Sequence, residues 1–110
     1  MRKAPLTPDA AELIARRFLA LSDATRLRLV DLLRTRGEAS VGELAEALGA
    51  SQQNVSKHLA TLHAEGFVSR RKQGTSSIYA IADPAVFELC EQVCGGIEAQ
   101  LSSAEAALKG

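Results

Sequence analysis

Aromatic residues, cysteines and long apolar runs are all scarce in this sequence. Its 110 residues include no tryptophan, one tyrosine, three phenylalanines and two cysteines, so we expect an aliphatic core. No run of about 18 apolar residues occurs, which excludes a membrane-spanning helix. No apolar segment follows Arg2 and Lys3, which argues against a signal peptide. We therefore expect the chain in the cytoplasm, where cysteines are normally thiols.

Net charge is absent too, because 13 basic and 13 acidic side chains cancel. Its distribution is uneven, since residues 51–82 carry a net charge of +3 and residues 83–110 one of −4. The basic stretch is compatible with a surface that neutralises DNA phosphates. Charge by itself nevertheless favours the simpler explanation of two solvated faces. Evidence for DNA binding must therefore come from the sequence motifs.

Caps and apolar periods predict a single, mainly α domain over residues 1–110 with the order α-α-α-α-β-β-α. Thr7 before Pro8 predicts the start of the first helix, and Asp23 that of the second. The first helix carries several large apolar side chains, namely Leu13, Ile14, Phe18 and Leu21. We expect the second helix to bury Leu27, Val30 and Leu33.

Residues 41–64 predict a helix-turn-helix. Ser40 and Glu43 have the spacing of a capping box before a short helix, and Ser51 is placed to cap the next one. That second helix has an inner apolar face of Val55, Leu59 and Leu62 and an outer face of Gln53, Asn54, Lys57 and Thr61. The second helix of this motif enters the major groove of DNA, where such side chains read base edges or contact phosphates. The alternative is an ordinary solvated face of a surface helix. The basic hairpin that follows favours the DNA-binding interpretation.

Residues 67–82 predict a β-hairpin, which would be the wing of a winged helix-turn-helix. Near its tip, Arg70, Arg71 and Lys72 are expected to neutralise phosphates without reading sequence. A charged edge that only discourages aggregation is the alternative. Asp83 followed by Pro84 predicts the start of a last helix over residues 84–107.

These segments resemble the ArsR/SmtB family of transcriptional regulators over roughly residues 10–100. Residues 21–28 (LSDATRLR) resemble the opening of the family's second helix, and residues 51–62 (SQQNVSKHLATL) resemble its recognition helix. The resemblance implies a homodimer built on the first and last helices and a repressor that an effector releases from operator DNA. It also implies DNA-facing roles for Ser56 and His58. The expected DNA contacts are then Ser51, Gln52, Gln53, Asn54, Ser56, Lys57, His58, Thr61, Arg70, Arg71 and Lys72.

The two histidines, His58 and His63, each have two possible interpretations. His58 and His63 lie at the edges of the apolar face of the recognition helix, so a partly buried, hydrogen-bonded histidine is as good an interpretation as a DNA contact. They are five residues apart and on opposite edges, so a metal site built from this pair is not expected.

Cys90 and Cys94 are the remaining candidates for a sensor. Their i, i+4 spacing places both thiols on one face of the last helix. Thiolates bind soft metal or metalloid ions and can also be oxidised, whereas free cysteines also pack as small hydrophobes. A metal site, a redox switch and simple packing at a helix seam all stay open.

The sequence therefore predicts a sequence-specific DNA-binding regulator and not an enzyme. It has no glycine-rich phosphate loop, and its cysteines and histidines fall on different predicted elements, which disfavours a Cys-His nucleophile. Two alternatives remain: a regulator of the same fold without thiol or metal sensing, and a winged-helix module that binds protein.

Overall fold

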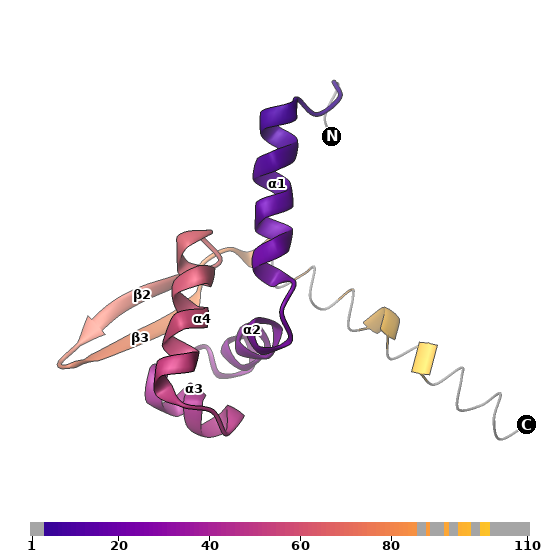
Figure 1. Ribbon diagram of the computed structural model, residues 1–110. Helices are drawn as coiled ribbons and strands as arrows, with labels where there is room; N and C mark the ends of the chain where they lie inside the picture. The colour runs from indigo at the N-terminus through magenta and orange to yellow at the C-terminus, as the bar shows by residue number, and fades with distance from the viewer. Residues whose placement is uncertain (1–3, 86–87, 89–91, 93–94, 98–99, 102–110) are drawn as a thin grey trace, which may run out of the picture.

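The computed structural model describes residues 4–85, 88, 92, 95–97, 100 and 101. The elements run α1 (Pro8–Leu21), α2 (Ala24–Arg36), β1 (Glu38–Ser40), α3 (Val41–Leu48), α4 (Gln52–Ala64), β2 (Val68–Gln73) and β3 (Ser76–Ile81) (Figure 1). The described residues from Pro84 onward are helical and fall within the predicted last helix. In the described part of the chain, no helix is long and apolar enough to cross a membrane.

The predicted winged helix-turn-helix is confirmed, with the addition of a strand that the sequence did not predict. The three strands form one antiparallel sheet in the order β1-β3-β2. In it, Ala39 of the short strand β1 lies opposite Tyr79, and Val68 of β2 lies opposite Ile81. Three residues are too few to show an alternating pattern, so β1 is defined only by its pairing with a distant strand.

Helices α1 to α4 each begin at the cap that the sequence predicts. The side-chain oxygens of Thr7, Asp23, Ser40 and Ser51 each accept a hydrogen bond from the backbone N–H three residues later. At α3 the capping box is complete, because the Ser40 N–H donates to Glu43 Oε1 at 2.9 Å while the Glu43 N–H donates to Ser40 Oγ at 3.1 Å. The hydrogen bond from the Ser40 N–H, and after it the Ser40 hydroxyl, lowers the pKa of the Glu43 carboxyl. The caps fix where each helix of the motif starts.

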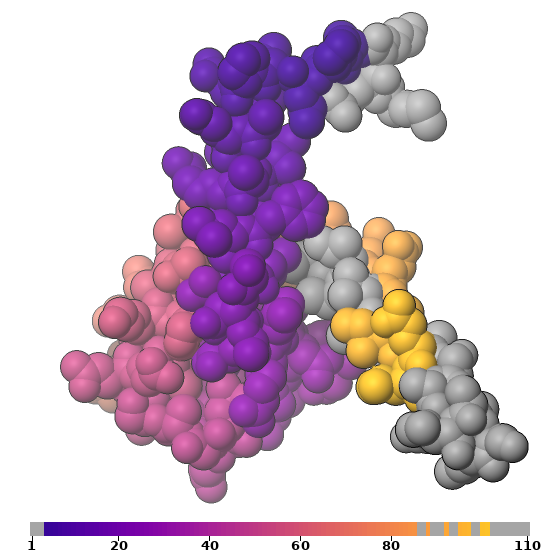
Figure 2. All heavy atoms as spheres, turned by 45° about the vertical axis from the view of Figure 1, so that its right-hand side comes forward, coloured from indigo at the N-terminus to yellow at the C-terminus, as the bar shows by residue number. Residues whose placement is uncertain are grey.

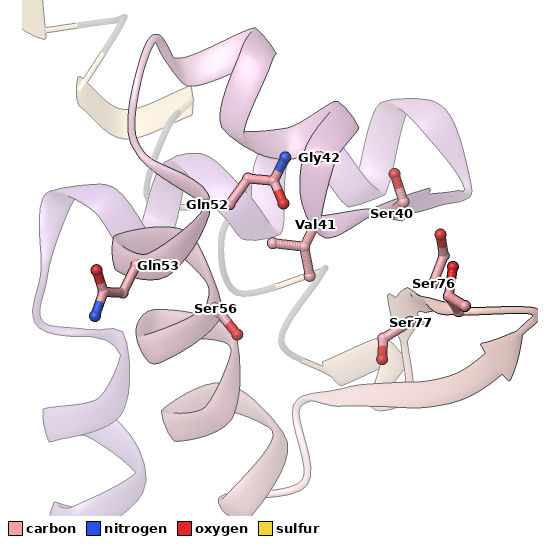
Figure 3. Close-up of a pocket in the computed structure, with 9 residues that line it drawn as sticks. Ser40, Val41, Gly42, Gln52, Gln53, Ser56, Ser76 and Ser77 are labelled. Atoms are coloured by element: carbon pink, nitrogen blue, oxygen red, sulfur yellow. The ribbon is translucent and has the colours of Figure 1, made fainter.

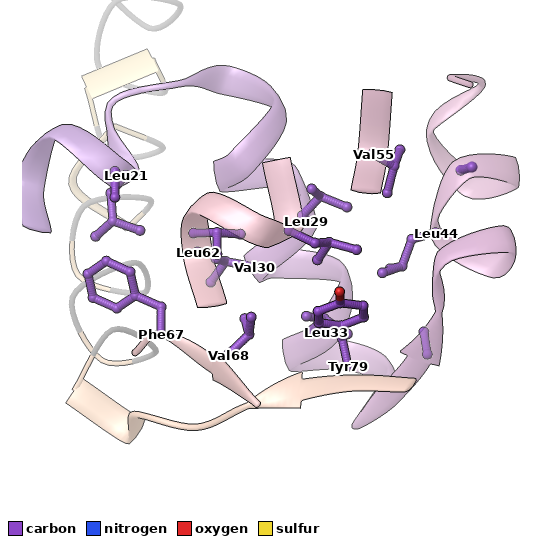
Figure 4. Packing of buried hydrophobic residues seen from close by; sticks show 14 residues of the cluster. Leu21, Leu29, Val30, Leu33, Leu44, Val55, Leu62, Phe67, Val68 and Tyr79 are labelled. Carbon is purple, nitrogen blue, oxygen red and sulfur yellow. The ribbon is translucent and has the colours of Figure 1, made fainter. Parts of the chain in front are cut away.

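The core lies between the helices and the sheet and is aliphatic, as expected (Figure 4). Its largest fully buried side chains are Leu29, Val30, Leu33, Leu44, Val55, Leu59 and Leu62. The single tyrosine, Tyr79, is buried against them from β3. One expected core residue is wrong, because Leu27 is 43% exposed and Leu29 takes its place on the buried face of α2. Leu29, Val30 and Leu33 share one face of that helix, and Leu27 lies outside it.

Candidate nucleic-acid interface

Helix α4 separates an apolar inner face from a polar outer face. Val55, Leu59 and Leu62 are completely buried, and this fixes the rotation of the helix about its own axis. The outward residues Ser51, Gln52, Gln53, Asn54, Ser56 and Lys57 are all exposed. Thr61 is half-buried, and its hydroxyl donates to the Lys57 carbonyl at 3.4 Å. The polar side chains of the first two turns are thus presented to solvent.

The hydroxyl of Ser51 differs from the other polar groups at the start of α4 because its oxygen already accepts a hydrogen bond within the chain. Ser51 Oγ accepts from the Asn54 N–H at 3.1 Å, so this hydroxyl caps the helix. Lys57, by contrast, takes part in no ion pair among the described residues. Of the residues predicted on this helix, Gln53, Asn54 and Lys57 are exposed and carry polar side chains that reach farther than the serine hydroxyls.

The three cations of the wing do not lie in equivalent surroundings. Arg71 Nη2 donates to Glu38 Oε1 of β1 at 2.8 Å, and Arg71 Nη1 donates to Gln73 Oε1 at 2.8 Å. Arg70 and Lys72 are exposed and form no ion pair within the described residues. Side chains alternate between the two faces of a strand, so Arg71 lies on the opposite face from these two. The wing thus carries two uncompensated cations on one face and one neutralised cation on the other.

A polar groove joins the wing to the helix-turn-helix (Figure 3). It has a volume of about 490 Å³, and its walls come from the starts of α3 and α4 and from the tip of the wing. Its lining consists of Ser40, Val41, Gly42, Gln52, Gln53, Ser56, Thr75, Ser76 and Ser77. Hydroxyls and amides dominate this set, and no lining side chain is charged. We did not predict Thr75, Ser76 and Ser77 as candidates from the sequence, although three consecutive hydroxyl side chains at a hairpin tip were a usable signal.

His58 faces the interior of the motif instead of the outer surface of α4. Its Nδ1 lies 3.2 Å from Arg26 Nη1 and 3.7 Å from Asp23 Oδ2, and its side chain is 19% exposed. The pKa of the Asp23 carboxyl is lowered, chiefly by the hydrogen bond from the Arg26 backbone N–H and to a smaller extent by the charge of Arg26. The geometry favours the partly buried, hydrogen-bonded alternative for His58 over a direct DNA contact. His63 is exposed near the end of α4.

Helix α1 presents an apolar surface with little cover. Leu13 is 50% exposed and Phe18 is 57% exposed, and the helix projects beyond the helix-turn-helix (Figures 1 and 2). At its base lies an apolar pocket of about 180 Å³, lined by Ile14, Arg17, Phe18, Leu21, Phe67, Asp83 and Ala85. Large apolar side chains exposed together on one helix commonly mark an interface.

Neither Cys90 nor Cys94 is among the described residues, so the predicted thiol site lies outside them. Within the described ranges, no group of three or more histidine, cysteine, aspartate or glutamate side chains could hold a metal ion. The candidate interface defined above therefore consists of α4, the wing and the groove between them.

Known proteins resemble this chain in both sequence and structure. The family model of bacterial regulatory proteins of the arsR family matches residues 23–70, which include α2, α3 and α4. A probable mercury resistance operon repressor from Streptomyces lividans is 44% identical over 75 residues, which cover 68% of this chain. The chain spans only 59% of the length of that relative.

Two solved structures share the fold over most of both chains. The crystal structure of the antimony-specific transcriptional repressor AntR matches with a TM-score of 0.81 and 30% identity, covering 93% of each chain. The homodimeric winged helix-turn-helix DNA-binding domain of Mb0332 from Mycobacterium bovis matches with a TM-score of 0.73 and 31% identity, covering 88% of this chain and 91% of that one. These relatives are transcriptional regulators and not enzymes, in agreement with the prediction.

Proposed function

We propose, since this chain belongs to the arsR family of bacterial regulatory proteins, that it is a repressor which binds operator DNA as a homodimer in the cytoplasm. One observation carries the proposal. The buried residues of α4 turn Gln53, Asn54 and Lys57 outward, and the basic wing lies beside the same helix. This surface has the two elements by which winged helices hold a duplex.

Helix α4 would enter the major groove with its first two turns. There the side-chain amides of Gln53 and Asn54 can each form two hydrogen bonds with an adenine, and Lys57 can reach guanine or a phosphate. Arg70 and Lys72 of the wing would neutralise phosphates and so set the orientation of the protein on the duplex. The groove of about 490 Å³ between them would face the backbone of the same strand, where its serine hydroxyls can donate to phosphate oxygens.

A second copy of the chain would cover the apolar face of α1 and, as predicted from the sequence, the last helix over residues 84–107. The exposure of Leu13 and Phe18 supports this partner, as does the homodimeric state of the Mb0332 domain. In a two-fold dimer the two α4 helices would lie about 34–36 Å apart, one turn of the duplex, so the operator would be an inverted repeat.

Fluorescence anisotropy on the DNA upstream of the gene itself tests the proposal. The variant Gln53→Ala/Asn54→Ala should lose specific affinity, because each lost bidentate contact costs about 1–3 kcal/mol of discrimination. Its affinity for unrelated DNA should stay close to that of the wild type, because phosphate contacts are independent of sequence. Wild-type protein that binds upstream and unrelated DNA equally weakly would favour the protein-interaction alternative.

An effector that releases the repressor would act at Cys90 and Cys94. The support is their i, i+4 spacing and the named responses of two relatives, one to mercury and one to antimony. Two copies of the chain would supply four thiols, which suits a soft metal or metalloid ion. Cys90→Ser/Cys94→Ser protein should then stay on DNA when Hg(II), Sb(III) or As(III) releases the wild type. If oxidant alone releases the wild type, the pair is a redox switch, and if the variant responds normally, the pair only packs.

A further inference from the structure

Arg26 connects three elements of the motif from a single side chain. Its Nε donates to the carbonyl of Ala20, and its Nη2 donates to the carbonyl of Leu19 at 3.4 Å, both in the last turn of α1. Its Nη1 lies 3.2 Å from His58 Nδ1 on α4. The arginine itself belongs to the first turn of α2, where its backbone N–H is held by Asp23 Oδ2 at 3.0 Å. The end of α1, the start of α2 and the middle of α4 therefore meet at one guanidinium.

The end of α1 needs a donor from elsewhere in the chain. The last carbonyls of a helix have no partner within the helix, and basic side chains near that end are favourable. In α1 the last turn contains no basic residue, and Ser22 supplies only its backbone N–H, to the Leu19 carbonyl at 3.0 Å. Arg26 supplies the missing cation from α2, which fixes how the end of α1 sits on the rest of the motif.

The contact with His58 extends this connection to the recognition helix. His58 Nδ1 can accept from the Arg26 guanidinium only if that nitrogen carries no proton, which places the ring proton on Nε2. Two charged groups lie within 4 Å of this ring among the described residues, namely Asp23, the N-cap of α2, and Arg26 in the first turn of α2. The cations of α1 are directed elsewhere, since Arg16 pairs with Glu65 and Arg17 lies 3.9 Å from Asp83.

We infer that Arg26 is a positioning residue for DNA recognition, which holds α4 against the end of α1 through a hydrogen bond to neutral His58. This inference rests on the proposed function. His58 directly follows Lys57 and lies about one turn after Asn54, so a loss of the hydrogen bond lets the DNA-facing side of α4 shift. It acts together with the hydrophobic face of α4, which fixes the helix rotation, and with the ion pair between Arg16 of α1 and Glu65 at the end of α4.

Substitutions at both ends of the hydrogen bond test the inference. Arg26→Gln and His58→Leu should each weaken specific DNA binding about tenfold, the loss expected for one hydrogen bond to a charged group. The double variant should bind no more weakly than Arg26→Gln, because that variant has already lost the contact with His58 together with the contacts to the end of α1. His58→Asn, whose Oδ1 replaces Nδ1 as the acceptor, should bind nearly as well as the wild type. His63→Leu on the same helix is the matched control and should have no effect.

The rescue by His58→Asn supplies a readout that a merely structural role would not change. Asparagine restores an acceptor for Arg26 but not the shape of the imidazole ring. A loss of binding by His58→Asn equal to that of His58→Leu, or a loss in the double variant beyond that of Arg26→Gln, would overturn the inference.

A measurement without DNA separates this inference from the proposed function. ¹⁵N NMR of the free protein should show His58 with its proton on Nε2 and Nδ1 as an acceptor, and Arg26→Gln should shift the Nδ1 signal. If that signal does not respond to Arg26→Gln, the contact is absent and the inference fails. If it responds while Gln53→Ala/Asn54→Ala leaves specific binding unchanged, the contact exists but the proposed DNA-reading role of α4 is wrong.

Discussion

Helices α1 and α4 have almost the same length but bury their apolar residues in different ways. In α4, of 13 residues, Val55, Leu59 and Leu62 are fully buried by the chain's own core. In α1, of 14 residues, Leu13 and Phe18 stay at least half exposed. Large apolar side chains left exposed together commonly mark an interface. Among the described residues, the apolar face of α4 is covered and that of α1 is not, which supports the proposed dimer.

The largest expected effect comes from the buried side of this comparison. Leu59→Ala removes a completely buried side chain from the contact of α4 with the core. Such a substitution costs about 2–5 kcal/mol of the free energy of unfolding, through lost burial and the cavity that remains. Urea denaturation followed by circular dichroism measures the loss. The control is Ala60→Gly, an exposed position of the same helix, which should cost only about 1 kcal/mol.

The exposed side of the comparison predicts a change in assembly. Phe18→Glu places a carboxylate on the apolar face of α1, where a second copy would have to bury it, and buried unpaired charges are strongly unfavourable. We expect the dimer dissociation constant to rise at least about 100-fold, which corresponds to about 2.7 kcal/mol. Sedimentation equilibrium gives that constant, and circular dichroism should show an unchanged helix content. A Phe18→Glu protein that stays dimeric would show that the chain pairs through another surface.

The wing offers a second comparison, between Arg71, which pairs with Glu38, and Arg70, which forms no ion pair among the described residues. Arg70→Ala and Lys57→Ala should each reduce the slope of log K against log salt by about 1, because each removes one phosphate contact. Arg71→Ala should leave the slope nearly unchanged, since Glu38 already neutralises this cation. Anisotropy titrations at several salt concentrations measure the slopes. Equal reductions for Arg70→Ala and Arg71→Ala would mean that Glu38 releases its partner when DNA binds.

The features that the sequence predicted well are local. The capping side chains belong to Thr7, Asp23, Ser40 and Ser51. Each accepts a hydrogen bond from the backbone N–H only three residues later, so spacing alone identifies it. The outward face of α4 likewise follows from the period of its apolar residues. This is why the order of helices and hairpin and the exposure of Gln53, Asn54 and Lys57 could be predicted.

The features that the sequence did not predict join distant residues. Arg71 and Glu38 are 33 positions apart, and Arg26 and His58 are 32 apart. No periodic pattern shows which cation meets which acceptor at such separations, because the pairing depends on how β1 and α2 pack in three dimensions. The direction of His58 and the neutralisation of Arg71 were therefore visible only in the structure.

The smallest expected effect tests the local cap of α3. Its hydrogen bonds lower the pKa of Glu43 in the folded state, so its contribution is present above the usual value of 4.5 and is lost as pH falls through the lower folded value. Glu43→Gln should therefore have a flatter dependence of stability on pH below about pH 5 than the wild type. Thermal unfolding at pH 3 to 7 measures this, with Glu46→Gln on the same helix as the control. The start of α3 forms one wall of the groove at Ser40 and Gly42. If the capping box also holds this wall in place, Glu43→Gln should bind DNA more weakly at neutral pH. Unchanged binding would assign the capping box to folding alone.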